Sequence, residues 1–177
     1  MNRILAVIGM CGSGKSEAVK FLMEKGFSRV YFGDVVMNEL IAKKLEINEV
    51  NERMMRENLR KEFGMGVMAL KSLDAIRKLY NKGNIVIESL YSWEEFKIVK
   101  NEFRESFELL NIFTTKELRY KRLNARPYRP LTNNEAESRD ISEIEKLDKG
   151  GPIAFADYTI FNDTTLDDLK SEIDKLF

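Results

Sequence analysis

The sequence of 177 residues predicts an α/β fold in which a five-stranded parallel sheet carries helices on both faces. Short apolar runs typical of buried strands alternate with longer segments whose apolar residues recur at helical spacing. A glycine-rich loop joins the first apolar run to the first helical segment. Strands that alternate with helices form a parallel sheet covered on both sides. The expected strands are residues 4–8, 29–32, 85–87, 107–113 and 157–161.

Helices are expected between these strands, in a single domain that covers residues 1–177. The expected helices are residues 16–23, 35–45, 48–63, 66–80, 93–102, 115–125, 132–147 and 165–176. Gly26 is a stop signal after the first helix, and Thr115 is expected to cap the helix after the fourth strand. Residues 149–152 are expected to form a loop. Residues 35–80 form a helical insertion, and residues 119–148 form a lid.

Composition excludes several classes of function. The chain has 29 basic and 29 acidic residues, so its net charge of zero argues against a nucleic-acid partner. It has no histidine, which excludes Ser-His-Asp triads and His-liganded zinc, and its single cysteine, Cys11, excludes an intrachain disulfide. No apolar run is long enough to span a membrane, and no signal peptide precedes the first strand. A cytoplasmic monomer or homodimer is therefore expected.

Residues 9–16 spell G-x-x-x-x-G-K-S, the Walker A phosphate loop, between a strand and a helix as this motif requires. Its glycines let successive backbone N–H groups point at phosphate oxygens, and the following helix adds the positive end of its dipole. Lys15 is expected to reach the β- and γ-phosphates and the Ser16 hydroxyl to bind Mg²⁺. The residues expected to bind ATP with Mg²⁺ are Gly9, Met10, Cys11, Gly12, Ser13, Gly14, Lys15, Ser16 and Glu17.

Two carboxylates follow strands at the carboxyl edge of the expected sheet, where ligands bind in such folds. Asp34 follows the second strand and is expected to act as a general base for an acceptor hydroxyl or as an outer Mg²⁺ ligand. The alternative is that Asp34 caps the next helix. Glu88 ends the third strand in the Walker B arrangement and is expected to hold Mg²⁺ directly or through water. For Glu88 the alternative is a solvated charge.

Two groups of arginines are candidates for phosphate binding. Arg119, Arg122 and Arg126 are spaced three and four residues apart and so share one helix face. Guanidinium groups bind phosphate oxygens in pairs, so this face is expected to stabilise the transferred phosphoryl group from a lid. A solvated basic face is the alternative. Arg60 belongs to a second basic cluster and is expected to bind the phosphate of an acceptor.

With these features the chain resembles the nucleoside-monophosphate kinase superfamily of P-loop NTPases. More narrowly, it resembles the archaeal adenylate-kinase-related, dephospho-coenzyme-A-kinase-like proteins, over nearly its whole length. The resemblance rests on residues 8–16, 33–36, 58–60 with Gly64, 84–88, 119–122 and 156–162.

The resemblance implies ATP·Mg²⁺ as donor, an acceptor site in the helices between strands two and three, and an arginine lid. It also implies that Asp34 is the base and that Asn162 lies near the donor adenine. The chain departs from the family pattern at three positions. Phe32 replaces an aspartate, Asn38 replaces an arginine, and Tyr91 replaces the arginine that would hold the acceptor phosphate.

The leading expectation is a phosphotransferase that moves the γ-phosphoryl group of ATP to a nucleotide-like acceptor. The acceptor is expected to contact Asp34, Arg60, Glu88 and Tyr91. AMP is the first candidate and dephospho-coenzyme A the second, because Arg60 suits a phosphate acceptor and Asp34 a hydroxyl. The alternative, which the departures favour, is a nucleotide-binding sensor or weak NTPase; an RNA-associated ATPase fits the zero net charge poorly. No guanine-reading N/T-K-x-D motif occurs, which favours ATP over GTP.

Overall fold

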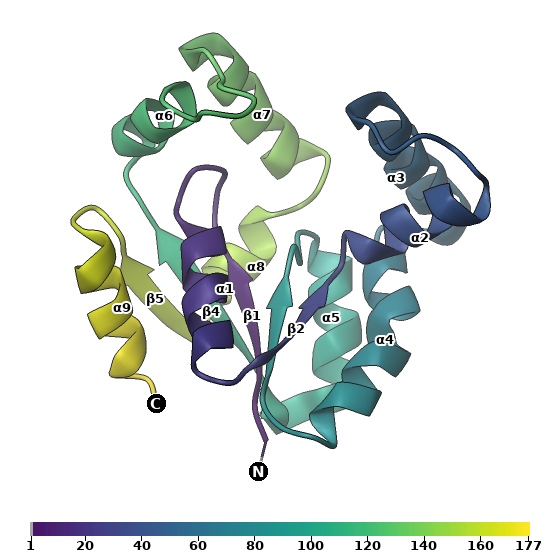
Figure 1. The fold of residues 1–177 in the computed structure, drawn as a ribbon, viewed down its shortest axis with the longest axis horizontal. Helices are drawn as coiled ribbons and strands as arrows, with labels where there is room; N and C mark the ends of the chain where they lie inside the picture. The colour runs from purple at the N-terminus through teal and green to yellow at the C-terminus, as the bar shows by residue number, and fades with distance from the viewer. Residues whose placement is uncertain (1) are drawn as a thin grey trace.

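In the computed structural model, which describes residues 2–177, the strands form one five-stranded parallel sheet in the order β2-β3-β1-β4-β5 (Figure 1). The strands are β1 (Ile4–Ile8), β2 (Ser28–Tyr31), β3 (Ile85–Glu88), β4 (Phe107–Phe113) and β5 (Tyr158–Phe161). In the register of the sheet, Ile4 lies opposite Ile85 of β3 on one side and Phe107 of β4 on the other. The central place of β1 brings the loop that follows it to the middle of the carboxyl edge.

The helices are α1 (Lys15–Glu24), α2 (Asp34–Ala42), α3 (Glu49–Phe63), α4 (Val67–Tyr80), α5 (Trp93–Phe103), α6 (Lys116–Asn124), α7 (Asn133–Glu145), α8 (Gly150–Ala154) and α9 (Leu166–Asp174). A single 3₁₀ turn, Arg104–Ser106, precedes β4. Within residues 2–177, none of the helices combines the length and the apolar character that a membrane span requires.

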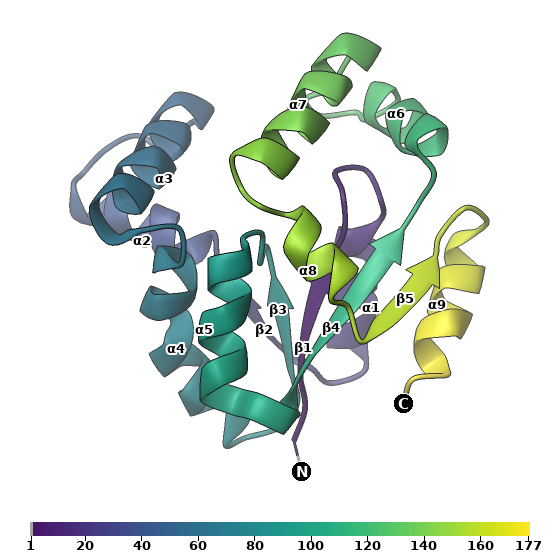
Figure 2. The same cartoon turned by 180° about the vertical axis from the view of Figure 1, so that it is seen from behind.

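Both faces of the sheet are covered by helices. All residues of β1 are buried, as expected for a strand of a parallel sheet with helices on both sides. Helices α1 and α9 cover one face, where Leu22 and Ile173 join one hydrophobic cluster. Helices α4, α5 and α8 cover the other, where Ile76 and Val99 join a second cluster with the strands (Figure 2). The sheet with its two helical layers is the architecture that the sequence predicts.

Two local expectations were wrong, and a third was right only in part. The segment expected as a loop at 149–152 begins the short helix α8, which tolerates Pro152 because a helix's first turn does not use its amide hydrogens. Thr115 is the N-cap residue of α6, as expected, but its side chain makes no capping hydrogen bond; instead, Asp163 accepts hydrogen bonds from the backbone N–H and the hydroxyl of Thr115. The helix expected to reach residue 45 ends at Ala42, since Lys44 takes a left-handed backbone conformation (φ 54°).

Two pairs of helices rise above the carboxyl edge of the sheet (Figure 1). Helices α2 and α3 lie on the side of β2 and β3, and α6 and α7 lie above the phosphate loop. A small hydrophobic cluster of Cys11, Tyr120, Leu123 and Ala136 joins the second pair to that loop. The pair α6–α7 therefore packs directly on the phosphate loop.

Candidate active site

The phosphate loop keeps its shape because two of its glycines leave no room for a side chain. Gly9 (φ 135°) and Gly14 (φ 100°) both have backbone conformations that other residues rarely adopt. A Cβ at Gly9 would overlap the carbonyl oxygen of Ile112, and a Cβ at Gly14 would overlap the Nδ2 of Asn162. No side chain among the described residues caps the first turn of α1, and the amide of Glu17 bonds to the carbonyl oxygen of Gly14, so the amides of Lys15 and Ser16 are the ones available to an anion.

Lys15 is the first residue of α1 and folds back over the phosphate loop. Its Nζ donates a hydrogen bond of 2.8 Å to the carbonyl oxygen of Met10. Burial and the nearby Lys149 lower the pKa of Lys15 to about 7. A bound phosphate would supply the negative charge that the lysine lacks, so anion binding is expected to raise this pKa.

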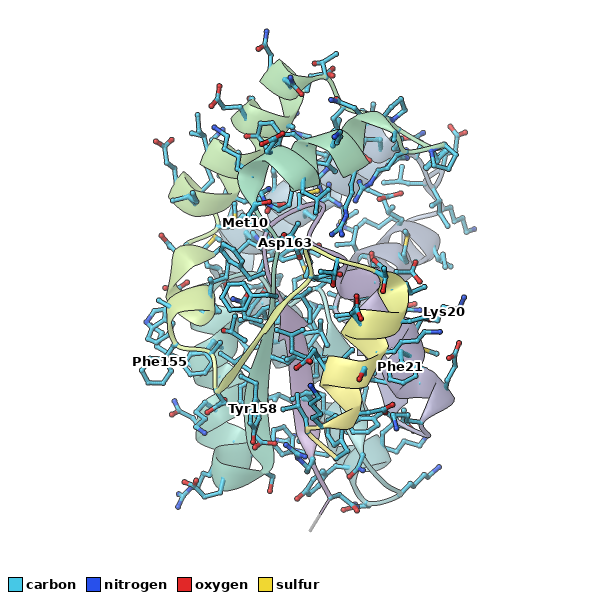
Figure 3. The ribbon with its side chains drawn as sticks, turned by 90° about the vertical axis from the view of Figure 1, so that its left-hand side faces the viewer. Met10, Lys20, Phe21, Phe155, Tyr158 and Asp163 are labelled. Carbon is cyan, nitrogen blue, oxygen red and sulfur yellow. The ribbon has the colours of Figure 1, made fainter. Side chains whose placement is uncertain are left out.

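Asn162, at the end of β5, supports the phosphate loop from below. Its Nδ2 donates a hydrogen bond of 2.8 Å to the carbonyl oxygen of Ser13, and the side chain is buried. Thr114, at the end of β4, donates to the same carbonyl oxygen at 3.0 Å. Figure 3 shows Met10 and Asp163, which follows Asn162, at the same end of the sheet, beneath the lid helices. The predicted adenine contact of Asn162 remains a prediction, whereas its contact with the loop is direct.

Arg119 of α6 is buried and holds the lid to the phosphate loop. It forms two hydrogen bonds with Asp140 of α7, of 2.9 and 2.6 Å, and donates a third, of 2.9 Å, to the carbonyl oxygen of Cys11. Bidentate pairs of this kind are the strongest that side chains form. All three bonds go to the protein, so in this conformation Arg119 acts as an anchor.

The other two predicted lid arginines, Arg122 and Arg126, have surroundings different from those of Arg119. Arg122 donates hydrogen bonds to the hydroxyl of Thr114 at 3.2 Å and to the carbonyl oxygen of Asn162 at 2.9 Å. Arg126 is exposed, beyond the end of α6. The structure therefore does not arrange the three guanidinium groups as one phosphate-facing set, because tertiary partners take up two of them. Their predicted role in transfer remains a prediction.

A narrow pocket lies between α2, α3 and the ends of β2 and β3. Its volume is about 60 Å³, much smaller than typical ligand sites. The pocket is lined by Tyr31, Phe32, Gly33, Val36, Met37, Glu52, Arg56, Arg60, Met68, Ser89 and Tyr91. Two predicted acceptor residues, Arg60 and Tyr91, are thus brought together.

Arg60 lines this pocket, and the charge of Glu95 on α5 acts on it. Within residues 2–177, the buried Nε of Arg60 and Oε1 of Glu95 have no hydrogen-bond partner. Burial raises the pKa of Glu95 to about 7, although its other oxygen accepts hydrogen bonds from the amides of Tyr91 and Ser92. An unpartnered buried guanidinium nitrogen is costly, so Arg60 is suited to an anionic ligand.

The two predicted carboxylates lie in different environments. Glu88 forms an ion pair of 2.6 Å with Arg29 of β2. Arg29 thus compensates the negative charge of Glu88, which was predicted to hold Mg²⁺. Asp34 begins α2, after the N-cap Gly33, so the alternative in which Asp34 is the N-cap is wrong. The side chain of Asp34 is exposed and lies outside the pocket lining.

No group of three His, Cys, Asp or Glu side chains capable of holding a metal occurs within residues 2–177. Mg²⁺ in nucleotide sites usually takes few protein ligands and keeps several waters and phosphate oxygens. Ser16, exposed in the first turn of α1, fits such a site as its single hydroxyl ligand.

Comparison with known proteins identifies the family. A model of the AAA domain matches residues 5–144. A UPF0200 protein of Thermococcus kodakarensis is 33% identical, over 98% of this chain and 95% of the relative. A UPF0200 protein of Methanosarcina barkeri is 30% identical, over 97% and 92%. The chain belongs to the UPF0200 family and carries an AAA domain.

Solved structures show the fold that this UPF0200 protein shares with others. Shikimate kinase from Bacteroides thetaiotaomicron superposes with a TM-score of 0.62 at 13% identity, over 99% of this chain and 98% of that one. A sugar kinase from Janibacter gives 0.56 at 14%, over 98% and 92%. TT1252 from Thermus thermophilus gives 0.60 at 19%, over 99% and 96%. The predicted P-loop, kinase-like α/β fold is confirmed, and such a fold generally binds ATP with Mg²⁺.

Three charged residues of this UPF0200 protein enter the site without having been assigned a role there from the sequence. Lys149, just before α8, is 1% exposed and pairs with Glu143 of α7 at 2.7 Å. Arg139, one helical turn before Glu143, lies 3.4 Å from the same carboxylate. The i, i+4 spacing of Arg139 and Glu143 was visible in the sequence, but it also describes ordinary solvated helix pairs. No sequence signal marked Lys149.

Proposed function

We propose that this UPF0200 protein is an ATP-dependent kinase that transfers the γ-phosphoryl group of ATP·Mg²⁺ to a nucleotide-like acceptor carrying a phosphate. The observation that carries the proposal is the pair of arginines, Arg56 and Arg60, lining a pocket whose other end holds Tyr91. Lys149 lies over the ring of Tyr91, 4.5 Å from its centroid, and lowers the pKa of Lys15 in the phosphate loop. Lys149 thus contacts a residue of the pocket and acts electrostatically on the donor site.

On the donor side, the backbone N–H groups of the loop and Lys15 bind the phosphates. Mg²⁺, when bound with the nucleotide, would neutralise the charge of the phosphate oxygens, and Ser16 is the residue suited to hold it. Glu88 would contribute, directly or through water, after loosening its pair with Arg29. Arg122 would position the donor end of the loop through Asn162, and Arg126 would approach the phosphates only if the lid moved further.

On the acceptor side, AMP is the first candidate and dephospho-coenzyme A the second. A phosphate acceptor is already ionised near neutral pH and needs cations more than a general base. Arg60 offers a buried, unpartnered nitrogen, while Asp34 is exposed outside the pocket. A ribose hydroxyl acceptor would need Asp34 to move toward the transferred group, so the arrangement favours AMP or another nucleoside monophosphate.

A nucleotide-binding sensor or weak NTPase is the second candidate function. Its support is the pocket volume of about 60 Å³, which is much smaller than that of typical ligand sites. Kinases open and close around their acceptors, so α2 and α3 would have to move outward for the first candidate to hold.

The test is ATP turnover with Mg²⁺, alone and with AMP, other nucleoside monophosphates or dephospho-coenzyme A, followed by product chromatography. We expect one acceptor to be phosphorylated, with loss of activity in Lys15→Ala and a lower apparent acceptor affinity in Arg60→Met. Lys61→Met, an exposed neighbour, is the matched control for Arg60→Met. Nucleotide binding without any acceptor-dependent turnover would refute the kinase and leave the sensor.

A further inference from the structure

A cluster of charges lies between the lid helix α7 and the start of α8, and two of its members, Lys149 and Glu143, are buried. Lys149 is 1% exposed and Glu143 is 7% exposed. The Nζ of Lys149 donates a hydrogen bond of 2.7 Å to one oxygen of Glu143, and the Nε of Arg139 lies 3.4 Å from the other. The Glu143 carboxylate thus interacts with two cations, Lys149 and Arg139.

The cluster has more positive than negative charge. Burial alone would raise the pKa of Glu143, but Lys149, Lys15 and Arg139 together hold it below its usual value. Lys15, when it is protonated, adds a third positive charge that acts on the same carboxylate. Lysine is almost never fully buried unless it is paired, and here a buried lysine and a half-exposed arginine share one carboxylate, which is an expensive arrangement for structure alone. The same excess of charge suits a site that receives a multiply charged anion.

Lys149 links the lid to the acceptor pocket. Its ammonium group lies 4.5 Å from the ring centroid of Tyr91, which lines the acceptor pocket, and its carboxylate partner belongs to the lid. Lys149 therefore contacts both the lid and a residue of the acceptor pocket, and its charge acts on Lys15 of the donor loop.

We propose that Lys149 is a phosphate-binding residue of this site and that the Glu143 carboxylate takes the position of the γ-phosphoryl group until ATP binds. The inference deepens the proposed function and rests on it. On ATP binding, Lys149 would exchange one oxygen of Glu143 for one oxygen of the γ-phosphate, with no covalent bond formed or broken. Lys149 would then supply, from another part of the chain, a positive charge next to the position where Tyr91 replaces the arginine of the family pattern.

The experiment compares binding of ADP and of the non-hydrolysable β,γ-imido analogue of ATP, with Mg²⁺, by calorimetry. Lys149→Met keeps most of the side-chain length and removes the charge, and Lys146→Met, at an exposed position three residues earlier, is the matched control. Hydrogen bonds to charged groups correspond to a roughly ten- to hundredfold change in affinity. We expect Lys149→Met to lose about that much affinity for the ATP analogue and little for ADP, while Lys146→Met binds both like the wild type.

A second pair of variants tests the part assigned to Glu143. Glu143→Gln removes the competing charge, so it is expected to bind the ATP analogue several-fold more tightly than the wild type. Glu145→Gln, exposed on the same helix, is expected to change neither affinity. Weaker analogue binding by Glu143→Gln would overturn the idea that this carboxylate takes the position of a phosphate.

The outcomes separate this inference from the proposed function. A wild-type protein that binds neither nucleotide refutes the proposed function itself. A wild type that binds both, with Lys149→Met binding the ATP analogue equally well, refutes only the role of Lys149. Equal losses for ADP and the ATP analogue in Lys149→Met would mean that Lys149 supports the fold of the lid, and would overturn the inference as well.

Discussion

The lowered pKa of Lys15 makes nucleotide binding depend on pH in a calculable way. In the free protein, burial and Lys149 bring this pKa to about 7, so the lysine is about half protonated at neutral pH. Phosphate oxygens favour the protonated form, so binding of ATP raises the pKa and takes up a proton. The perturbation to apply is therefore pH, with the wild type compared to Lys15→Arg, whose guanidinium group stays charged over the whole range.

The magnitude follows from the fraction of Lys15 that is protonated before binding. With a pKa of about 7 this fraction is roughly 0.9 at pH 6 and roughly 0.1 at pH 8. If the bound pKa lies well above 8, affinity falls about tenfold between these two pH values, which is about 1.4 kcal/mol of binding free energy. At pH 8 each binding event then takes up nearly one proton.

Calorimetric titration with ATP·Mg²⁺ at several pH values, in buffers of different ionisation enthalpy, measures both quantities. Lys15→Arg corrects for titration of the nucleotide itself. We expect the wild type to lose about tenfold more affinity than Lys15→Arg between pH 6 and pH 8. Parallel curves for the two proteins, with no proton uptake in the wild type, would show that Lys15 keeps its ordinary pKa and would refute the reasoning.

The same shift has a consequence for folding without nucleotide. The folded pKa of Lys15 is below its unfolded value, so the unfolded chain binds more protons between about pH 7 and pH 10.5. The contribution of Lys15 to stability therefore rises with pH across that window. Lys15→Met is expected to stabilise the nucleotide-free protein more at pH 6 than at pH 9 in urea unfolding.

Three further predictions concern the lid and the acceptor pocket. Asp140→Ala leaves Arg119 buried without its counter-ion and should lower the free energy of unfolding in urea by about 3–5 kcal/mol; a loss below about 1 kcal/mol would show that the pair is not buried in solution. Cys11 is buried beneath the lid, so iodoacetamide should alkylate it faster in Asp140→Ala than in the wild type. Equal alkylation rates would contradict the anchoring of the lid by Arg119. Burial raises the pKa of Glu95 to about 7, so the folded state binds more protons than the unfolded chain between about pH 4.5 and pH 7. The stability contribution of Glu95 should be lost as pH rises through that window, and Glu95→Gln should flatten the slope in urea unfolding; an unchanged slope would mean that Glu95 has its ordinary pKa.

Local sequence was a good guide wherever one short segment decides the structure. The buried strands were predicted within one or two residues because an apolar run of four to seven residues has few alternatives beside a glycine loop. The phosphate loop was predicted because backbone conformation and close packing at single positions require glycine there. Segment 149–152 was predicted as a loop because two glycines and a proline are typical of loops, although a helix's first turn also accepts them.

The charged residues of the site were a poorer target for sequence reasoning. Arg119 was predicted to bind phosphate from the lid, but in the structure it pairs with Asp140 and donates to the carbonyl oxygen of Cys11, 108 residues away in the sequence. Glu88 was predicted to hold Mg²⁺, which stays a prediction, and its ion pair with Arg29 of the neighbouring strand was not predicted. A long charged side chain can satisfy several partners, and its choice depends on which elements the fold brings within reach.

The sequence by itself determined the alternation of strands and helices and the phosphate loop, because these depend on hydrophobic period and backbone conformation within a few residues. The sequence also determined the family, since relatives of about one-third identity align with nearly the whole chain. Only the tertiary structure decided that Arg119 anchors the lid, that Arg60 and Tyr91 share a pocket, and that Lys149 and Glu143 lie beside Lys15. Those arrangements depend on pairing between distant segments in a buried, weakly screened interior, where a charge must find a partner that no local pattern specifies.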